Sequence, residues 1–343
     1  MTMVPDGEPI LIWGAGAIGG VIGAYLARAG QAVHMVDIVE SHVDAMRSGG
    51  LSIEGPVDTF RQALIADTPE TLQGKFRRVI LAVKAHHTDA ALDQLIKHLS
   101  DDGFVVSAQN GLNEKRIAER IGSERTMGCF VNFGADWLEP GRILYGNRAA
   151  VALGELDGTM TPRLNNMHGL FRVVEPDAVM TDNIWGYLWG KLGYGALLFA
   201  TALTPESMAD AMASPAHRAV YGALGSEVMR LAVAEGVTPL GFNGFDTQAF
   251  IRQDREGIEQ SIAAMVAHNR NTAKTHSGIY RDLAVRKRKT EVDAQMGIML
   301  TIGEHHGIPT PAIAGLCSLI HDIEEGRRAQ SMELLDEMLP LCV

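Results

Sequence analysis

A glycine-rich turn near the N-terminus constrains the fold of this chain more than any other feature. It reads Gly14-Ala15-Gly16-Ala17-Ile18-Gly19 and directly follows the apolar run Ile10–Trp13. That run predicts a buried parallel strand. Residues Ala17–Ala29 then have helical spacing and end before Gly30, and Ala32–Val36 is apolar again. The pattern predicts a β-α-β unit.

The three glycines of this turn have separate functions in a dinucleotide-binding fold. Gly14 permits the tight turn, Gly16 lets the backbone approach a pyrophosphate, and Gly19 allows the helix to pack closely on the strand. The N-terminus of the helix offers N–H groups and a positive dipole end to phosphates. We therefore expect the turn to bind a dinucleotide, and a glycine-rich turn without a ligand is the alternative.

Asp37 ends the second predicted strand, 18 residues beyond Gly19. A carboxylate at this position accepts hydrogen bonds from adenosine ribose hydroxyls and repels a 2′-phosphate. The next residues, Ile38, Val39 and Glu40, supply no arginine to hold such a phosphate. Asp37 thus favours NAD over NADP as the cofactor. The alternative is that Asp37 only caps a helix over residues 40–47.

Alternating strand and helix patterns continue along the first half of the chain. The expected strands are Arg78–Val83, Phe104–Ala108 and Met127–Phe133, and the expected helices are Thr88–Leu99 and Asn113–Ile121. This alternation predicts a doubly wound parallel sheet of the Rossmann type, an α/β domain. Right-handed crossovers place the loops 14–19, 84–88 and 109–112 at one edge. Residues 139–154, around Pro140-Gly141, predict an antiparallel addition to that sheet.

The pattern changes after about residue 180, where strand signals end and helical spacing continues to the C-terminus. A chain of 343 residues is also too long for one ordinary core. We expect a dinucleotide-binding domain over 1–180 and an all-α domain over 181–343, which binds substrate and forms a homodimer. The boundary is expected between 178 and 183.

Composition excludes several other classes of function. The net charge of −11 disfavours a nucleic-acid partner. The three cysteines lack metal-site spacing, free thiols fit the cytoplasm, and the start of the chain lacks a basic leader. The apolar stretch 192–203 is too short to cross a membrane. No metal is expected, because His305 and His306 are neighbours and point about 100° apart on a helix.

Lys191 is the strongest candidate for a catalytic group. It is the only charged residue from Asn183 to Leu203. Reduction of a carbonyl builds negative charge on oxygen, which a positioned cation or proton donor stabilises. Lys191 could supply that proton, and the alternative is a lysine whose stem packs while its ammonium reaches water.

Five segments together resemble the ketopantoate reductase family over nearly the whole chain. In order, they are GAGAIGG at 14–20, LAVKA at 81–85, QNGL at 109–112, WGKL at 189–192 and KTEVDAQMG at 289–297. The resemblance implies a Rossmann domain, a helical domain and an active site in the cleft between them. It also implies hydride transfer from NADPH to a 2-oxo acid.

The resemblance assigns functions to four residues. Lys191 matches the catalytic lysine, Glu291 a substrate-contacting glutamate, Asn110 an asparagine beside nicotinamide and substrate, and Lys84 a lysine near cofactor or substrate. From the residues alone, Glu291 could simply lie in the first turn of a helix capped by Thr290. Asn110 could be a turn former and Lys84 a solvated loop lysine.

The chain departs from the family pattern at several positions. Gly195 and Phe199 stand where the family carries asparagines, four and eight residues after the lysine. Losing groups that bond substrate hydroxyls changes substrate preference, so ketopantoate itself is in doubt. His87, beside His86, stands where the family often has a glutamine, three residues after Lys84. Both His87 and Ser277 are candidate substrate contacts.

We therefore expect an oxidoreductase that uses NAD or NADP to interconvert a small 2-oxo acid or hydroxy ketone and its alcohol. Lys191 is the expected general acid, with Glu291 and Asn110 as further catalytic residues. One alternative is an NAD-dependent dehydrogenase of another hydroxy acid or hydroxy ketone, outside pantothenate synthesis. The other is a non-catalytic NAD(P)-binding sensor.

Overall fold

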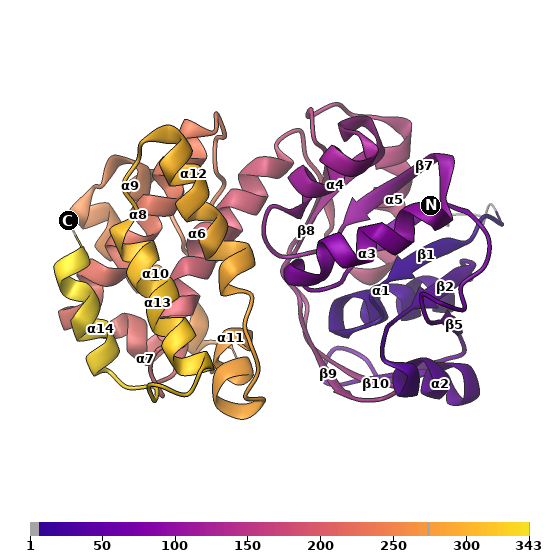
Figure 1. Cartoon of the computed structure of the whole chain (residues 1–343), viewed down its shortest axis with the longest axis horizontal. Helices are drawn as coiled ribbons and strands as arrows, with labels where there is room; N and C mark the ends of the chain where they lie inside the picture. The colour runs from indigo at the N-terminus through magenta and orange to yellow at the C-terminus, as the bar shows by residue number, and fades with distance from the viewer. Residues whose placement is uncertain (1–6, 273–274, 343) are drawn as a thin grey trace. The chain divides into compact units, whose positions relative to one another are not determined.

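The computed structural model describes residues 7–272 and 275–342. The chain divides into two compact units, Met1–Ile184 and Trp185–Val343 (Figure 1). The first unit is built on β-sheets and the second on helices, so the predicted α/β and all-α classes are both confirmed.

The first unit contains an eight-stranded sheet whose centre is parallel. Its strand order is β12-β11-β8-β7-β6-β1-β2-β5. The five expected strands are all present and parallel, as β1 (Ile10–Trp13), β2 (Val33–Val36), β6 (Phe76–Leu81), β7 (Leu99–Ser107) and β8 (Thr126–Val131). Strand β7 begins five residues earlier than predicted, because Leu99 pairs with Phe76 beyond a register shift. The helix before it, α3 (Thr88–Leu95), is correspondingly shorter.

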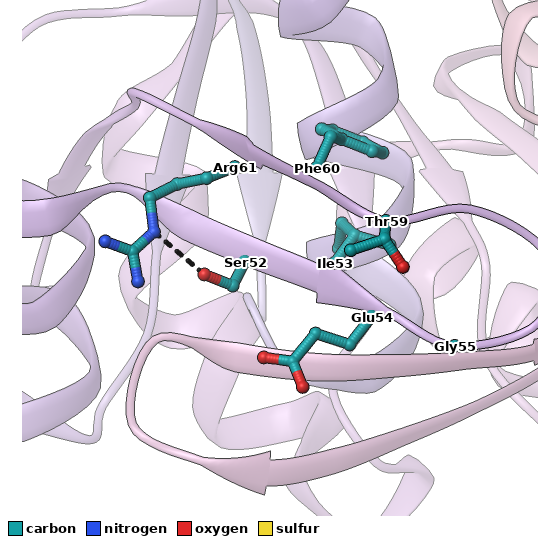
Figure 2. A pocket seen from close by; sticks show the side chains of 7 residues that line it. All are labelled: Ser52, Ile53, Glu54, Gly55, Thr59, Phe60 and Arg61. Atoms are coloured by element: carbon teal, nitrogen blue, oxygen red, sulfur yellow. Dashed lines mark hydrogen bonds between the residues drawn. The ribbon is translucent and has the colours of Figure 1, made fainter.

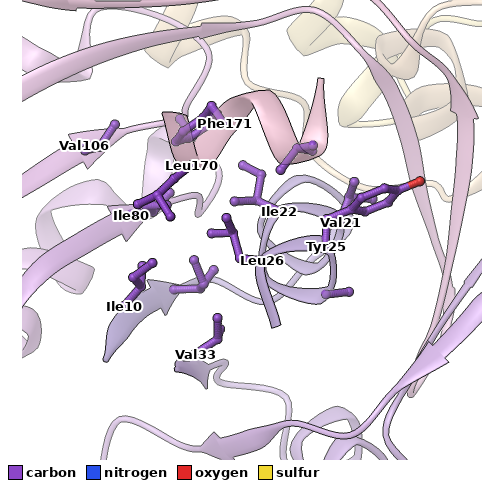
Figure 3. Close-up of a cluster of buried hydrophobic side chains, with 14 of the residues drawn as sticks. Ile10, Val21, Ile22, Tyr25, Leu26, Val33, Ile80, Val106, Leu170 and Phe171 are labelled. Atoms are coloured by element: carbon purple, nitrogen blue, oxygen red, sulfur yellow. The ribbon is translucent and has the colours of Figure 1, made fainter. Parts of the chain in front are cut away.

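Alternate residues of the central strands face two different helical layers. In β1, Ile10 and Ile12 lie in one buried cluster with α1 (Ala17–Arg28) and α5 (Pro162–Val174) (Figure 3). Leu11 and Trp13 lie in a second cluster with α3 and α4 (Asn113–Ile121). Each fully buried aliphatic side chain contributes about 1.5–3 kcal/mol. This double burial explains why the strand sequence is continuously apolar.

A second sheet of four strands packs against α1 and was not expected as a separate layer. It has the order β4-β3-β10-β9, formed by β3 (Leu51–Glu54), β4 (Phe60–Gln62), β9 (Gly134–Glu139) and β10 (Arg142–Asn147). The antiparallel addition expected over 139–154 is right only for β11 (Val151–Glu155), which pairs with β8. The turn at Pro140-Gly141 instead connects β9 and β10 of the second sheet.

The two edge strands of the main sheet come from segments without a sequence signal. Strand β5 (Ile65–Asp67) lies parallel to β2, and β12 (Val179–Met180) lies parallel to β11. Both are only two or three residues long and largely exposed at their apolar side chains. Between β2 and β3 runs helix α2 (Glu40–Gly49).

The described residues of the second unit form helices and turns. The helices are α6 (Ile184–Thr201), α7 (Met208–Ala213), α8 (Arg218–Ala234), α9 (Thr247–Arg252), α10 (Arg255–Arg270), α11 (Gly278–Tyr280), α12 (Ile298–His306), α13 (Pro311–Glu324) and α14 (Glu333–Met338). Two π-helical turns, Arg281–Val285 and η6 (Asp293–Gly297), lie between α11 and α12. Among the described residues, none of the helices is both long and apolar enough to cross a bilayer.

Helix α6 contains glycines in two different environments. A Cβ built at Gly190 would lie 1.9 Å from the Leu240 carbonyl oxygen, and one at Gly193 would lie 2.7 Å from the Phe245 ring. These two glycines let neighbouring segments pack directly against the helix. At Gly195 the nearest described atom is Gln295 Oε1, at 3.9 Å. Packing within the unit therefore does not require Gly195.

Alanine substitution distinguishes the two environments. We expect Gly190→Ala to destabilise the protein by about 1–3 kcal/mol, because its methyl group overlaps a backbone carbonyl. Gly195→Ala should stabilise it by about 1 kcal/mol, since alanine is the better helix former and has room. Urea unfolding midpoints of the two variants measure both effects. A Gly190→Ala protein as stable as the wild type would contradict the packing described here.

Candidate functional site

The glycine loop has the backbone geometry that its sequence predicts. Gly14 has φ +98°, and a Cβ there would lie 2.8 Å from the Val83 amide nitrogen. A Cβ at Gly19 would lie 2.0 Å from the Gly14 carbonyl oxygen. Side chains at these two positions would push α1 away from β1 and β6. Gly14 and Gly19 therefore serve the turn and the close helix–strand contact.

Gly16 is different, because the space beside it is open. A Cβ built at Gly16 would meet no described atom within 4 Å. Gly16 directly precedes α1, whose first turn carries no acidic side chain. The first N–H groups of a helix lack intrahelical partners and attract anions. Open space over these groups fits the pyrophosphate of a dinucleotide, with Ala15, Ala17 and Ile18 completing the loop.

Asp37 follows β2 and its carboxylate is held by the backbone. Its Oδ1 accepts a hydrogen bond from the Val39 N–H at 3.0 Å, just before α2 begins. The N-cap residue of α2 is Val39, without a side-chain cap, so this contact is not the helix cap of the alternative interpretation. It fixes the carboxylate at the carboxyl end of the sheet, and because a carboxylate has several acceptor positions, Asp37 can also accept hydrogen bonds from ribose hydroxyls.

Arg47, the cation on α2, is engaged elsewhere. Its Nε donates to the Ala66 carbonyl at 2.7 Å, and its guanidinium pairs with Asp67. Burial alone would raise the pKa of Asp67, but hydrogen bonds from Thr71, His34 and Arg47 outweigh it and lower that pKa. Asp67 therefore stays ionised and keeps Arg47 at the edge strand β5.

The three loops expected at one edge of the sheet do meet, and Val83 is their common contact. Val83 lies against Gly14 of the glycine loop and directly precedes Lys84. Its carbonyl accepts a hydrogen bond from Gln109 Nε2 at 2.9 Å, which brings in the loop after β7. Asn110, next to Gln109, is exposed at this edge. Lys84 and Asn110 are thus brought to the same edge as the glycine loop.

A buried polar network, missed from the sequence, holds the last two loops together. Gln109 Nε2 also donates to Thr88 Oγ1 at 2.9 Å, and that hydroxyl donates to Asn113 Oδ1 at 2.9 Å. Asn113 Nδ2 donates to the Asn110 carbonyl at 2.7 Å. The network fixes the backbone that carries Asn110. Single polar residues after strands give no periodic signal by which it could have been found.

His42 is a second positioning group that the sequence did not reveal. It is 1% exposed and lies on α2. Its Nδ1 accepts the Gly141 N–H at 2.9 Å, so the proton is on Nε2, which donates to the Ala15 carbonyl at 2.9 Å. The neutral ring thereby joins the glycine loop to the β9–β10 turn. The partly exposed Trp137 of β9 packs edge-on against it, with ring centroids 6.1 Å apart.

In the second unit, Lys191 lies on the one accessible stripe of α6. From Gly186 to Thr204 the partly exposed residues are Tyr187, Lys191, Gly195 and Leu198, and the others are buried. Their spacing of three or four residues puts them on one helical face. Phe199 is fully buried, so its ring belongs to the core of the unit. Of the two departures on this helix, only Gly195 changes an accessible position.

Gln295 approaches the same stripe, and Glu291 belongs to the turn before it. The Gln295 N–H bonds the Glu291 carbonyl at 2.9 Å, so the two residues are one helical turn apart. Gln295 Oε1 then lies 3.9 Å from the Cβ position of Gly195 on α6. Thr290 Oγ1 accepts the Val292 N–H at 3.2 Å, but the helical turn η6 begins at Asp293 with Val292 as its N-cap, so Thr290 is not the cap that was predicted. The Thr290 N–H donates to Glu324 at 2.6 Å and not to Asp293.

Two further predicted substrate contacts lie in different surroundings. Ser277 is 2% exposed, and its Oγ accepts the Tyr280 N–H at 3.1 Å as the cap of α11. His87 is exposed in the short turn η1 (Ala85–His87), and its ring contacts His86 at 4.1 Å between centroids. Within the described residues, three or more potential metal ligands do not cluster anywhere.

A shallow hollow on the second sheet is not part of this arrangement. It lies between β3 and residues 55–61, where Arg61 Nε donates to Ser52 Oγ at 2.9 Å (Figure 2). None of the predicted cofactor or substrate residues lines it.

The comparisons with known proteins define the class of enzyme, an oxidoreductase that acts on a ketone or alcohol. The chain matches "Ketopantoate reductase PanE/ApbA" over residues 10–158 and "Ketopantoate reductase PanE/ApbA C terminal" over residues 183–324. It therefore belongs to the ketopantoate reductase family, as the sequence motifs indicated.

Curated relatives support the family along the whole chain. A 2-dehydropantoate 2-reductase of Mesorhizobium japonicum is 28% identical over 94% of this chain and 99% of its own length. A 2-dehydropantoate 2-reductase of Archaeoglobus fulgidus is 24% identical over 93% of this chain and 99% of its own length.

Solved structures show the same fold. A PanE/ApbA family ketopantoate reductase from Ralstonia eutropha has a TM-score of 0.77 and 25% identity, covering 94% of this chain and 100% of its own. A D-mandelate dehydrogenase, solved with NADH and anilino(oxo)acetate, has a TM-score of 0.80 and 21% identity, covering 93% and 99%. The fold is thus shared by reductases that differ in substrate.

Two matched variants test whether His42 positions the glycine loop for the cofactor. In His42→Gln the side-chain amide can still donate to Ala15, whereas in His42→Asn the amide oxygen can still accept from Gly141. We expect His42→Asn to weaken NADH binding about fivefold, the equivalent of one hydrogen bond of about 1 kcal/mol. His42→Gln should bind NADH almost as the wild type does. Titration followed by NADH fluorescence measures both, and equal losses in the two variants would contradict the prediction.

Proposed function

We propose that this chain reduces the carbonyl group of a small 2-oxo acid with hydride from NADH. Lys191 is the proton donor to the carbonyl oxygen, and Glu291 orients the substrate. The observation that carries the proposal is the accessible stripe of α6, on which Lys191 is the one ionisable ammonium of an otherwise buried helix, with the Glu291–Gln295 turn against it.

The chemistry of Lys191 follows from its surroundings. An ammonium group at the edge of an apolar helix stabilises negative charge that develops on a carbonyl oxygen and can give that oxygen its proton. The carboxylate of Glu291 offers acceptors for a substrate hydroxyl and so favours one orientation. Tyr187 and Leu198, one turn to either side of Lys191 and Gly195, lie on the same face.

The first unit supplies the cofactor site. Residues Gly14 to Gly19 bind the pyrophosphate, and Asp37 accepts hydrogen bonds from the adenosine ribose. Lys84 and Asn110, at the same edge of the sheet, are proposed to contact the nicotinamide half. When bound, the dihydronicotinamide supplies the hydride. The buried Gln109–Thr88–Asn113 network holds Asn110 in place for this contact.

The preference for NADH rests on charge at the end of β2. The Asp37 carboxylate would repel a 2′-phosphate, and the guanidinium of Arg47 is already bound to Asp67 and Ala66. The D-mandelate dehydrogenase of the same fold was solved with NADH, which supports a similar preference here.

The ratio of kcat/KM for NADH over NADPH tests this preference. Replacing Asp37 with Ser removes the repelling charge, so we expect the ratio to fall by roughly tenfold or more, or about 1.4 kcal/mol. Asp44→Ser, which removes an exposed carboxylate from the following helix α2, should leave the ratio unchanged. A wild-type enzyme that prefers NADPH would overturn the interpretation of Asp37.

The identity of the substrate depends mainly on Gly195. The relatives are named 2-dehydropantoate 2-reductases, whereas the D-mandelate dehydrogenase was solved with anilino(oxo)acetate. Because Gly195 lacks a side chain on the accessible stripe, we propose a 2-oxo acid other than ketopantoate as the physiological substrate. Ser277 and His87 remain predicted substrate contacts, of which Ser277 already serves as a buried cap.

Replacing the proposed acid tests the mechanism. We expect Lys191→Ala to lower kcat for reduction of 2-oxo acids by roughly 10²- to 10⁴-fold, the usual loss of a general acid. NADH affinity should be retained, since the glycine loop belongs to the other unit. Lys97→Ala, at an exposed lysine, is the control and should turn over normally. Unchanged turnover in Lys191→Ala would remove that residue from the mechanism.

A further inference from the structure

The accessible glycine of α6 has no structural reason to be glycine. Gly190 and Gly193 on the same helix are required by contacts with Leu240 and Phe245, whereas a Cβ at Gly195 would be within van der Waals distance of Gln295 alone among the described atoms. A glycine inside a helix costs about 1 kcal/mol relative to alanine. Because packing does not explain this cost, the open space itself is the feature to explain.

The groups around this space are apolar on one side and polar on the other. Gly195 lies one turn after Lys191 and one turn before Leu198, all on the accessible stripe. Across from it, the Gln295 carboxamide comes from the turn that begins at Glu291. A carboxamide offers both a donor and an acceptor. The space left by the missing side chain of Gly195, called the recess below, is thus flanked by Lys191 and the aliphatic Leu198 on α6 and by one neutral polar group, the Gln295 carboxamide.

We propose that this recess receives the substituent of the 2-oxo acid and that Gln295 is the residue that determines which substituents are accepted. Gly195 supplies the room for a branched or aromatic group, and the Gln295 amide hydrogen-bonds a polar atom on that group. The inference rests on the proposed reduction of 2-oxo acids. It makes the substrate class 2-oxo acids whose branched or aromatic substituent is bulkier than that of ketopantoate and carries a polar atom within reach of the Gln295 amide.

The geometry also separates Gln295 from the catalytic groups. The backbone bond between Gln295 and Glu291 puts them one turn apart, so Gln295 contacts α6 at Gly195 while Glu291 occupies the preceding turn. Changing Gln295 should alter the binding of the substituent without altering proton transfer from Lys191. Its effects should therefore appear in KM more than in kcat.

Three probe substrates separate the effect of the substituent's size from the effect of its polarity. Pyruvate has a methyl substituent, 3,3-dimethyl-2-oxobutanoate has a branched apolar one, and ketopantoate has the same branched group with one added hydroxyl. Steady-state kinetics with NADH on the full-length protein gives kcat and KM for each. The two branched probes differ only in the hydroxyl, so their ratio reports on the polar contact.

Substitution at Gly195 tests whether the substituent of the 2-oxo acid needs the space that the missing side chain leaves. We expect Gly195→Val to lower kcat/KM for both branched acids at least tenfold relative to pyruvate, and Gly195→Ala to have a smaller effect in the same direction. Gly222→Ala is the matched control, because Gly222 on α8 is a helical glycine with space for a methyl group, its nearest described contact being Ile258 at 3.6 Å. It should leave all three ratios unchanged.

Substitution at Gln295 tests the polar contact. Gln295→Leu removes the amide but keeps the size, so we expect the kcat/KM ratio of ketopantoate to its hydroxyl-free analogue to fall about tenfold, through KM. Gln295→Asn, which retains a shorter amide, should recover part of that ratio. Unfolding midpoints show whether each variant is folded.

Failure of this inference and failure of the proposed function give different experimental results. Reduction of the probes by the wild type, with ratios unchanged in Gly195→Val and Gln295→Leu, overturns the inference and leaves the proposed function intact. A wild-type protein that binds NADH and reduces neither these three acids nor phenylpyruvate, an aromatic 2-oxo acid, overturns the proposed function, and the inference with it.

Discussion

The close contact between α1 and the strands β1 and β6 is the constraint on which the dinucleotide site depends. It exists because Gly14 and Gly19 carry no side chains where Cβ atoms would lie 2.8 Å from Val83 and 2.0 Å from a carbonyl oxygen. With the helix at this distance, its N-terminal N–H groups open onto the space beside Gly16. His42 holds the same loop from the other side through the Ala15 carbonyl. The loops that carry Lys84 and Asn110 are then placed by Val83 and Gln109.

In the second unit, burial decides which residues can act. Helix α6 is buried along most of its length, so the partly exposed stripe through Lys191 and Gly195 is its chemically accessible face. An ammonium group there lies beside apolar surface, an arrangement suited to stabilising charge on a substrate oxygen. Gln295 adds one neutral polar group to this face, and its turn begins at Glu291.

The parallel sheet and the glycine loop could be predicted because their residues obey short-range rules. Ile10–Trp13 is apolar at every position since both faces are covered, and the glycine spacing has a direct steric cause. The second sheet escaped prediction because β3 pairs with β10, about ninety residues later, and both strands are short. His42 and Gln295 escaped for the same reason, since each acts through a contact distant in sequence. Phe199 was expected to alter the substrate site, but tertiary packing buries it completely.

The central claim is that hydride moves from the cofactor to a carbonyl carbon on this enzyme. The most direct test uses NADH that carries deuterium at both positions of C4 of the dihydronicotinamide, the full-length protein and a panel of 2-oxo acids, with products analysed by mass spectrometry. We expect a 2-hydroxy acid that carries one deuterium on C2. Tight binding of NADH without deuterium in any hydroxy acid would contradict it and would indicate a non-catalytic dinucleotide sensor.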